Sequence, residues 1–161
     1  MKLSSGVEWS LHCCVVLSQA TTTVPAAQLA KLHGVSQTYL AKHLQALARA
    51  GLIRSVAGQD GGYLLTRAGS AISVLEVVLA VEGDEPAFRC TEIRQQGLLA
   101  APPKAIRKRC AIARTMAAAE AAWRDSLAGV SIADLADTID ADTGGVAMPR
   151  VRSLLASPTS R

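Results

Sequence analysis

Apolar residues in the first third of the chain recur at intervals of three and four, in short blocks separated by polar and turn-forming residues. This spacing is typical of amphipathic helices and predicts helices over residues 6–19, 26–32 and 37–50. A threonine run and Pro25 separate the first pair, while a glycine and Ser36, which can cap a helix, separate the second pair. The first fifty residues are therefore expected to form three helices around a common core.

Two strand-like runs follow at residues 52–56 and 63–66, with a glycine-rich loop between them. They predict a β-hairpin. A further amphipathic helix is predicted over residues 72–81, where a glycine and a proline end it. Three helices followed by a hairpin are the order of a winged helix-turn-helix, a DNA-binding fold whose third helix enters the major groove.

The second half of the chain has a different pattern. An irregular stretch precedes an alanine-rich helix predicted over residues 111–127, whose apolar face exceeds what a small winged-helix core covers. We therefore expect this helix to join two copies in a homodimer. The predicted division is a DNA-binding domain at 1–82, a cysteine-containing sensor segment at 83–110, the dimerisation helix and a following short helix at 111–141, and a flexible tail at 142–161.

Composition supports a mainly α fold. Hydrophobic residues make up 50% of the chain but aromatic residues only 3%, so Ala, Leu, Val and Ile must fill the core, which favours helices. The fold class predicted is mainly α, a winged helix-turn-helix with a small β-hairpin wing and a long dimerisation helix. The net charge of +4 at pH 7 suits a nucleic-acid binder, although a small positive excess is common elsewhere.

The sequence also argues against several other classes of protein. It has no run of eighteen uncharged apolar residues, and Glu8 and His12 interrupt the region that a signal peptide would need to be apolar. We therefore expect a cytoplasmic protein without a membrane partner. Because no nucleophile set, phosphate-binding glycine loop or paired acidic motif stands out, an enzyme is not expected.

The third predicted helix carries polar residues opposite its buried leucines. The start of a reading helix contacts base edges, and basic residues further along it or on the wing contact phosphates. Each of these residues alone is equally well explained as the solvated face of a surface helix. Together they give a predicted set of DNA-contacting residues: Ser36, Gln37, Thr38, Tyr39, Lys42, His43, Arg54, Gly61 and Gly62.

Three stretches of this region, Ser36–Lys42, Ala50–Ile53 and Gly61–Leu65, resemble the Rrf family of winged-helix regulators, which includes IscR and NsrR. The resemblance covers about residues 1–135, with the reading helix, the Ala-Gly-Leu junction, the Gly-Gly-Tyr wing and the later cysteines in the family's order. It implies a bacterial homodimer that binds palindromic double-stranded DNA. Many members also carry an iron–sulfur cluster beside the dimerising helix.

Cys90 and Cys110 lie in the predicted sensor segment, and Cys110 directly precedes the long helix, whose N-terminus favours a thiolate. The family pattern has three closely spaced cysteines there, whereas this chain has two. Glu8 and His12, four residues apart on the first helix, share a face at roughly 5 to 6 Å and form the best oxygen–nitrogen pair to complete a site. The resemblance implies a 2Fe–2S cluster held by Cys90 and Cys110 of one subunit with Glu8 and His12 of the other.

Other interpretations of these residues stay open. Free cysteines are often buried packing residues, and an acid or a histidine on a helix is often only solvated or satisfied in the core. At least one of Cys13 and Cys14 is interpreted as core packing, and neither as a ligand. If no metal binds, Cys90 and Cys110 can form a thiol–disulfide sensor instead. The function predicted is a DNA-binding transcription regulator controlled by a redox sensor, with a cluster favoured over a metal-free dithiol.

Overall fold

The computed structural model describes residues 3–58, 61–98 and 100–156, and it separates into two compact units. Residues 84–126 form one, here called the cysteine unit. The described residues before 84 and after 126 form the other, here called the core unit. Among the described helices, none has both the length and the apolar character to cross a membrane.

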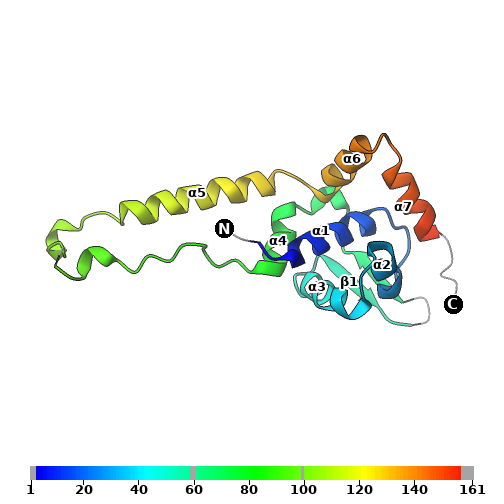
Figure 1. Cartoon of the computed structure of the whole chain (residues 1–161), viewed down its shortest axis with the longest axis horizontal. Helices are drawn as coiled ribbons and strands as arrows, with labels where there is room; N and C mark the ends of the chain where they lie inside the picture. Colours follow the sequence, from blue (N-terminus) through cyan, green and yellow to red (C-terminus); the bar gives the residue numbers. More distant parts are fainter. Residues whose placement is uncertain (1–2, 59–60, 99, 157–161) are drawn as a thin grey trace. The chain divides into compact units, whose positions relative to one another are not determined.

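The core unit begins with the predicted order of elements (Figure 1). Its first half contains α1 (Ser5–Ser18), α2 (Ala26–His33), α3 (Gln37–Arg49), β1 (Ile53–Val56), β2 (Gly62–Leu65) and α4 (Val74–Glu82). Leu40, Leu44 and Leu47, which form the apolar face of α3, are fully buried. Cys13 and Cys14 are also fully buried, and burial raises the pKa of each thiol to about 12. Both therefore serve as core packing.

The hairpin is attached to the core through β2. Strands β1 and β2 pair antiparallel, with Ile53 opposite Leu65 and Val56 opposite Gly62. The other edge of β2 bonds to the segment before α2, because the backbones of Val24 and Tyr63 exchange two hydrogen bonds of 3.0 and 2.9 Å. The hairpin loop includes residues 59–60, which lie outside the described part of the chain.

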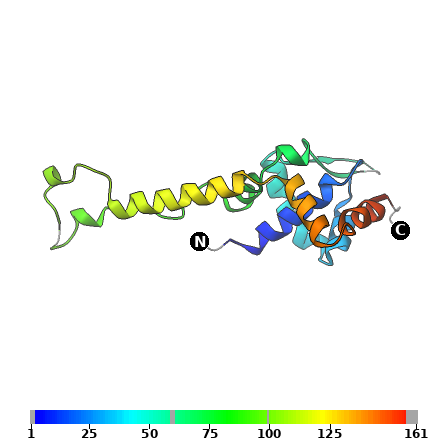
Figure 2. The same cartoon turned by 90° about the horizontal axis from the view of Figure 1, so that it is seen from above.

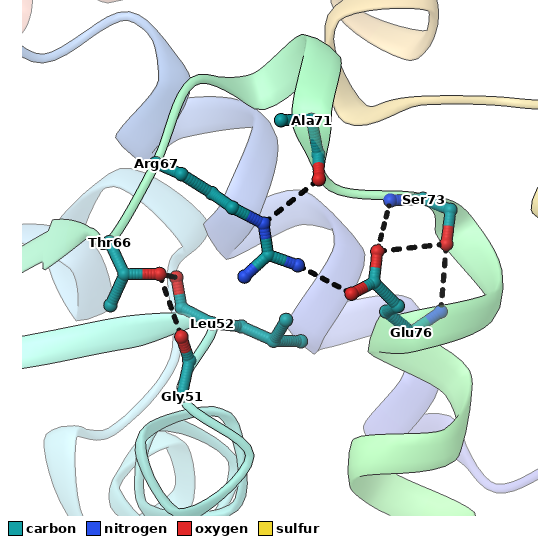
Figure 3. Close-up of polar contacts among 7 residues, drawn as sticks. All are labelled: Gly51, Leu52, Thr66, Arg67, Ala71, Ser73 and Glu76. Carbon is teal, nitrogen blue, oxygen red and sulfur yellow. Dashed lines mark hydrogen bonds and ion pairs between the residues drawn. The ribbon is translucent and has the colours of Figure 1, made fainter.

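A set of polar contacts fixes the base of the hairpin to α4 (Figure 3). The Thr66 hydroxyl donates to the carbonyl of Gly51 at 2.7 Å, where α3 has just ended. The Arg67 guanidinium donates to the carbonyl of Ala71 at 2.9 Å and pairs with Glu76. Glu76 also accepts from the backbone of its capping residue Ser73, so wing and helix are held as one piece.

The last two helices complete the core unit (Figure 2). Helix α6 (Ile132–Asp142) packs against α1, and α7 (Ala147–Ala156) follows and packs against α6. Ile132 of α6 and Met148 of α7 are buried in the same core as α1. The side chain of Gln28 on α2 donates to the carbonyl of Leu154 at 3.1 Å.

Helix α7 corrects the prediction of a flexible tail from residue 142, while residues 157–161 lie outside the described part. Gly144 and Gly145 have positive φ angles of 66° and 79°, which glycine adopts without strain, and they reverse the chain. After this turn the Met148 amide donates to the Asp140 carboxylate at 2.8 Å. Glycines that suggested a loose tail therefore form a tight connection.

The cysteine unit consists of an irregular segment and most of α5 (Ala111–Ala128), as the sequence predicted. The segment has short 3-10 turns at Ile93–Gln95 and Pro103–Ala105. Its start is held on α5, since Arg124 donates to the carbonyl of Asp84 at 3.0 Å and Glu120 accepts from the amide of Ala87 at 3.2 Å. Ala113 is the one buried residue of the described α5, so most of the helix surface has no cover in this chain.

Candidate functional site

The face of α3 opposite its leucines is open to solvent. Its exposed side chains start with Gln37 and continue along one stripe with Thr38, Lys42, Gln45 and Arg49, which follow one another at intervals of four, three and four. Such a stripe presents amides, a hydroxyl and cations to whatever lies along the helix. Gln45 belongs to this stripe but not to the predicted set, although its spacing of three from Lys42 was the available signal.

Ser36 and Tyr39 have structural tasks at the start of α3. The Ser36 hydroxyl caps the helix by accepting from the Tyr39 amide at 3.1 Å. The Tyr39 ring stands edge-on to Trp9 of α1, with ring centroids 6.1 Å apart, and the Lys42 ammonium lies 5.2 Å from the centre of that ring. The cap and these contacts fix the first turn of α3 against α1, which orients the neighbouring Gln37 and Thr38.

His43 belongs to α3, but its side chain is buried against α1. Its placement among the DNA-contacting residues is therefore corrected. Its side chain is 6% exposed, and a Cβ at Gly6 of α1 would lie 2.6 Å from its Cε1 atom. Burial, followed by the charge of Lys42, lowers the pKa of His43. Position 43 lies between Leu40 and Leu44 in helical spacing and falls at the edge of the apolar stripe, which polarity alone did not reveal.

The three predicted residues of the wing differ in their surroundings. Arg54 is exposed on β1, as a phosphate contact requires. Packing within the protein excludes a side chain at Gly62, because a Cβ there would lie 2.5 Å from the carbonyl carbon and oxygen of Val24. Gly61 is similar, since a Cβ would lie 2.6 Å from the carbonyl oxygen of Val56. Close backbone packing explains both glycines without DNA.

Glu8 and His12 lie exposed on α1, one helical turn apart. The carboxylate of Glu8 has no hydrogen bond or ion pair to any residue that the structure describes. The His12 ring stands 5.9 Å from the ring of His33 on α2. The prediction that Glu8 and His12 share an accessible face therefore agrees with the geometry of α1, while their role as ligands stays a prediction.

Cys90 and Cys110 come together in the cysteine unit although twenty residues separate them. The Cys110 thiol sits at the N-terminus of α5, where the amide N–H of Ala113 bonds to it and lowers its pKa. The amide of Ile112, the Arg94 guanidinium and a hydrogen bond from the Cys90 thiol act in the same direction, against the effect of desolvation. These contacts favour the thiolate form of Cys110, which is the form that binds metals and attacks disulfides.

A cavity of about 590 Å³ opens beside the two thiols. Its remaining walls are largely apolar, and Ile93, Leu98 and Ile112 are strongly exposed there, at 74%, 106% and 64%. Cys90 is exposed and Cys110 is buried. The thiol pair therefore lies at the edge of an apolar, solvent-accessible hollow that this unit alone does not close.

The structure brings the four predicted ligands together in two pairs. Cys90 and Cys110 belong to the cysteine unit, and Glu8 and His12 belong to the core unit. In the part of the chain that is described, no group of three or more His, Cys, Asp or Glu side chains is arranged to hold a metal ion. The four predicted ligands therefore form two pairs, one in each unit, and their joint role in binding a metal stays a prediction.

Comparisons with known proteins identify relatives of this chain. The family model Rrf2, described as an iron-dependent transcriptional regulator, matches residues 3–138. The HTH-type transcriptional regulator YffB of Lactococcus lactis is 35% identical over 139 residues, which is 85% of this chain and 88% of that protein. The HTH-type transcriptional regulator IscR of Klebsiella pneumoniae is 41% identical over 76 residues, about half of each chain at 47%.

Solved structures show the same fold. IscR of T. potens superposes with a TM-score of 0.64 at 21% identity and covers 91% of this chain and 93% of its own. CymR of Staphylococcus aureus, solved in an oxidized form, superposes with a TM-score of 0.60 at 25% identity, covering 84% of this chain and 96% of its own. The predicted winged-helix fold class is confirmed.

Proposed function

The chain belongs to the Rrf2 family of transcriptional regulators, which bind DNA, and on that premise we propose that its affinity for operator DNA is controlled by a 2Fe–2S cluster. The proposal places it in the cytoplasm as a homodimer on a palindromic operator, without enzymatic activity. The observation that carries it is the division of four suitable ligands into two matched pairs.

The residues fit such a cluster in number and chemistry. Two bridged irons each need two protein ligands. Thiolates and imidazoles are known cluster ligands, and a carboxylate together with imidazoles binds non-haem iron. Cys90 and Cys110 supply one pair, with Cys110 favoured as a thiolate by the N-terminus of α5. Glu8 and His12, accessible and adjacent on α1, supply the other pair. The open cavity beside the cysteines leaves room for a second copy to bring its α1.

A cluster of this kind supplies a one-electron redox change, and imidazole ligands raise its potential relative to an all-thiolate set. The chain's own residues connect that site to DNA. Glu8 and His12 are carried by α1, and α1 packs on the reading helix α3 through Gly6 against His43. A displacement of α1 therefore also displaces α3. We propose that the exposed stripe of α3 contacts the operator through Gln37, Thr38 and Lys42.

A metal-free thiol–disulfide sensor is the second candidate. It is favoured by one observation, that Cys90 and Cys110 of the same chain line the same cavity. In that case the two thiolates lose two electrons and form a disulfide, with a peroxide or another disulfide as the oxidant. Neither Glu8 nor His12 has a part in this alternative.

Anaerobic purification of the full chain separates the two. The proposal expects visible absorbance, with about two irons and two sulfides per protomer. Cys90→Ala and Cys110→Ala should remove the absorbance, while Glu8→Ala and His12→Ala should weaken the cluster or shift its potential.

Asp137→Ala is the matched control, because Asp137 is an exposed helical carboxylate on α6. An unchanged spectrum and potential in both the Glu8 and the His12 variants would refute this ligand set. Iron-free protein whose Cys90 and Cys110 oxidise to a disulfide would establish the second candidate.

A further inference from the structure

Positive charge is concentrated in the loop that leads into Cys110. Between residues 93 and 119 the sequence contains six Lys and Arg residues and no Asp or Glu. Four of the six, here called the basic loop, are Lys104, Arg107, Lys108 and Arg109. All four are exposed, and none forms an ion pair with a carboxylate among the described residues.

The basic loop is held in place by its backbone. Both terminal nitrogens of Arg94 donate to the carbonyl of Lys108 at 3.2 Å, and Arg94 is itself fixed by its ion pair with Glu92. A turn at its start is closed by the amide of Ala105, which bonds to Pro102 at 2.8 Å. The charges are therefore presented from a defined backbone, on the same unit as the thiol pair.

We propose that the basic loop is the docking surface for an acidic one-electron carrier protein of the ferredoxin class, which exchanges electrons with the site at Cys90 and Cys110. This inference rests on the proposed function. In the reducing direction the carrier loses one electron and the site gains one, and no atom or bond is transferred. The loop's cations lie directly before Cys110 in the chain, so docking places the carrier close to the redox site.

Charge and accessibility favour a carrier over a further stretch of DNA. Electron-transfer encounters use small interfaces, and opposite charges raise their association rates. The four cations are exposed and belong to the same unit as the thiol pair, so a carrier can dock on them without entering the cavity that the proposed function assigns to the second copy's α1. These cations would also attract DNA phosphates, but binding to DNA does not explain why the cations lie next to the redox site. DNA contact is therefore the competing outcome.

The test compares two charge-matched double variants of the full chain. Lys104→Ala with Lys108→Ala removes two charges from the basic loop, and Lys31→Ala with Arg150→Ala removes two exposed charges from the core unit. The probe is an acidic plant-type 2Fe–2S ferredoxin, with basic cytochrome c as the negative control. The binding of ferredoxin to iron-free protein is measured by interferometry at several salt concentrations. Electron transfer from ferredoxin to iron-loaded protein is measured by stopped flow.

At low salt, the loop variant should bind ferredoxin at least about fivefold more weakly than wild type. It should also accept electrons from ferredoxin at least about fivefold more slowly. The difference should vanish at high salt, and the core-unit variant should behave as wild type. Equal loss in both double variants, or none in either, would overturn the proposal.

A loop variant that keeps ferredoxin binding but loses affinity for duplex DNA of unrelated sequence would assign the loop to DNA. Because binding is measured on iron-free protein, failure of the cluster proposal shows separately, as absent iron and absorbance in wild type.

Discussion

Substituting Gly62 by alanine tests whether the wing glycine serves the fold or the DNA. The new Cβ would lie 2.5 Å from the Val24 carbonyl and 2.8 Å from the Pro25 nitrogen, and both are backbone atoms that cannot rotate away. Strand β2 must therefore move from the segment before α2. The two backbone hydrogen bonds between Val24 and Tyr63 lie directly at this contact.

The cost follows from these contacts. Overpacking costs about 1 to 3 kcal/mol, and two lost backbone hydrogen bonds cost about 1 kcal/mol each. Replacing glycine returns about 0.5 to 1 kcal/mol through the unfolded chain. We expect Gly62→Ala to lower the free energy of unfolding by about 2 to 4 kcal/mol.

Urea unfolding followed by circular dichroism, at one fixed protomer concentration, measures this loss. Ser55→Ala, at an exposed position of β1, is the control and should change stability by less than about 0.5 kcal/mol. The reasoning is wrong if Gly62→Ala unfolds like wild type yet binds DNA more weakly. That result would assign the glycine to close approach of the wing to the minor groove.

Three further predictions concern the dimer, the reading helix and the cap of α4. Ile112 is 64% exposed on α5, so Ile112→Asp should turn a homodimer into a monomer by light scattering, and a monomeric wild type at micromolar concentration would contradict the α5 interface. Lys42→Ala should weaken binding to all DNA sequences and reduce the salt slope by about 1, whereas Gln37→Ala should change base preference; unchanged salt dependence for Lys42→Ala would count against α3 as the reading helix. A hydrogen bond from the capping serine's backbone lowers the pKa of Glu76, so its stabilising effect is complete above the ordinary value of 4.5 and is lost as pH falls through the lowered pKa. Urea midpoints of wild type should therefore fall further between pH 5 and 3 than those of Glu76→Gln, and parallel curves would exclude this role.

The helices and hairpin of the first half were predictable because several local signals agree. Helix α3 has a serine cap at its start, a glycine just after its end and an apolar stripe between them, and these signals agree on one helix. Helix α7 was not predictable in this way, since Gly144, Gly145 and Pro149 are typical of a tail. The glycines instead make a turn, and Pro149 lies in the first turn of α7, where a missing N–H costs little.

The candidate site was predictable in its residue types but less so in its packing. Periodicity placed Gln37, Thr38 and Lys42 on the open face of α3, yet it did not show that His43 faces α1. That depends on Gly6, thirty-seven positions earlier, whose missing side chain makes the space. A contact between residues so distant in sequence leaves no local pattern.

Helix α1 is the element on which the proposed sensing and DNA reading converge. It packs against α3, α4 and α6, and the Glu82 carboxylate holds its start by accepting from the Ser4 amide at 2.9 Å. The two helices pack closely here, since even a Cβ at Gly6 would lie 2.6 Å from the Cε1 atom of His43, and we expect a shift of α1 toward α3 to be passed on at this contact. A proposed ligand that binds Glu8 and His12 and moves α1 would therefore also move α3. The proposed control of operator affinity by the cluster therefore requires, by linkage, that operator binding change the affinity for the cluster by the same factor.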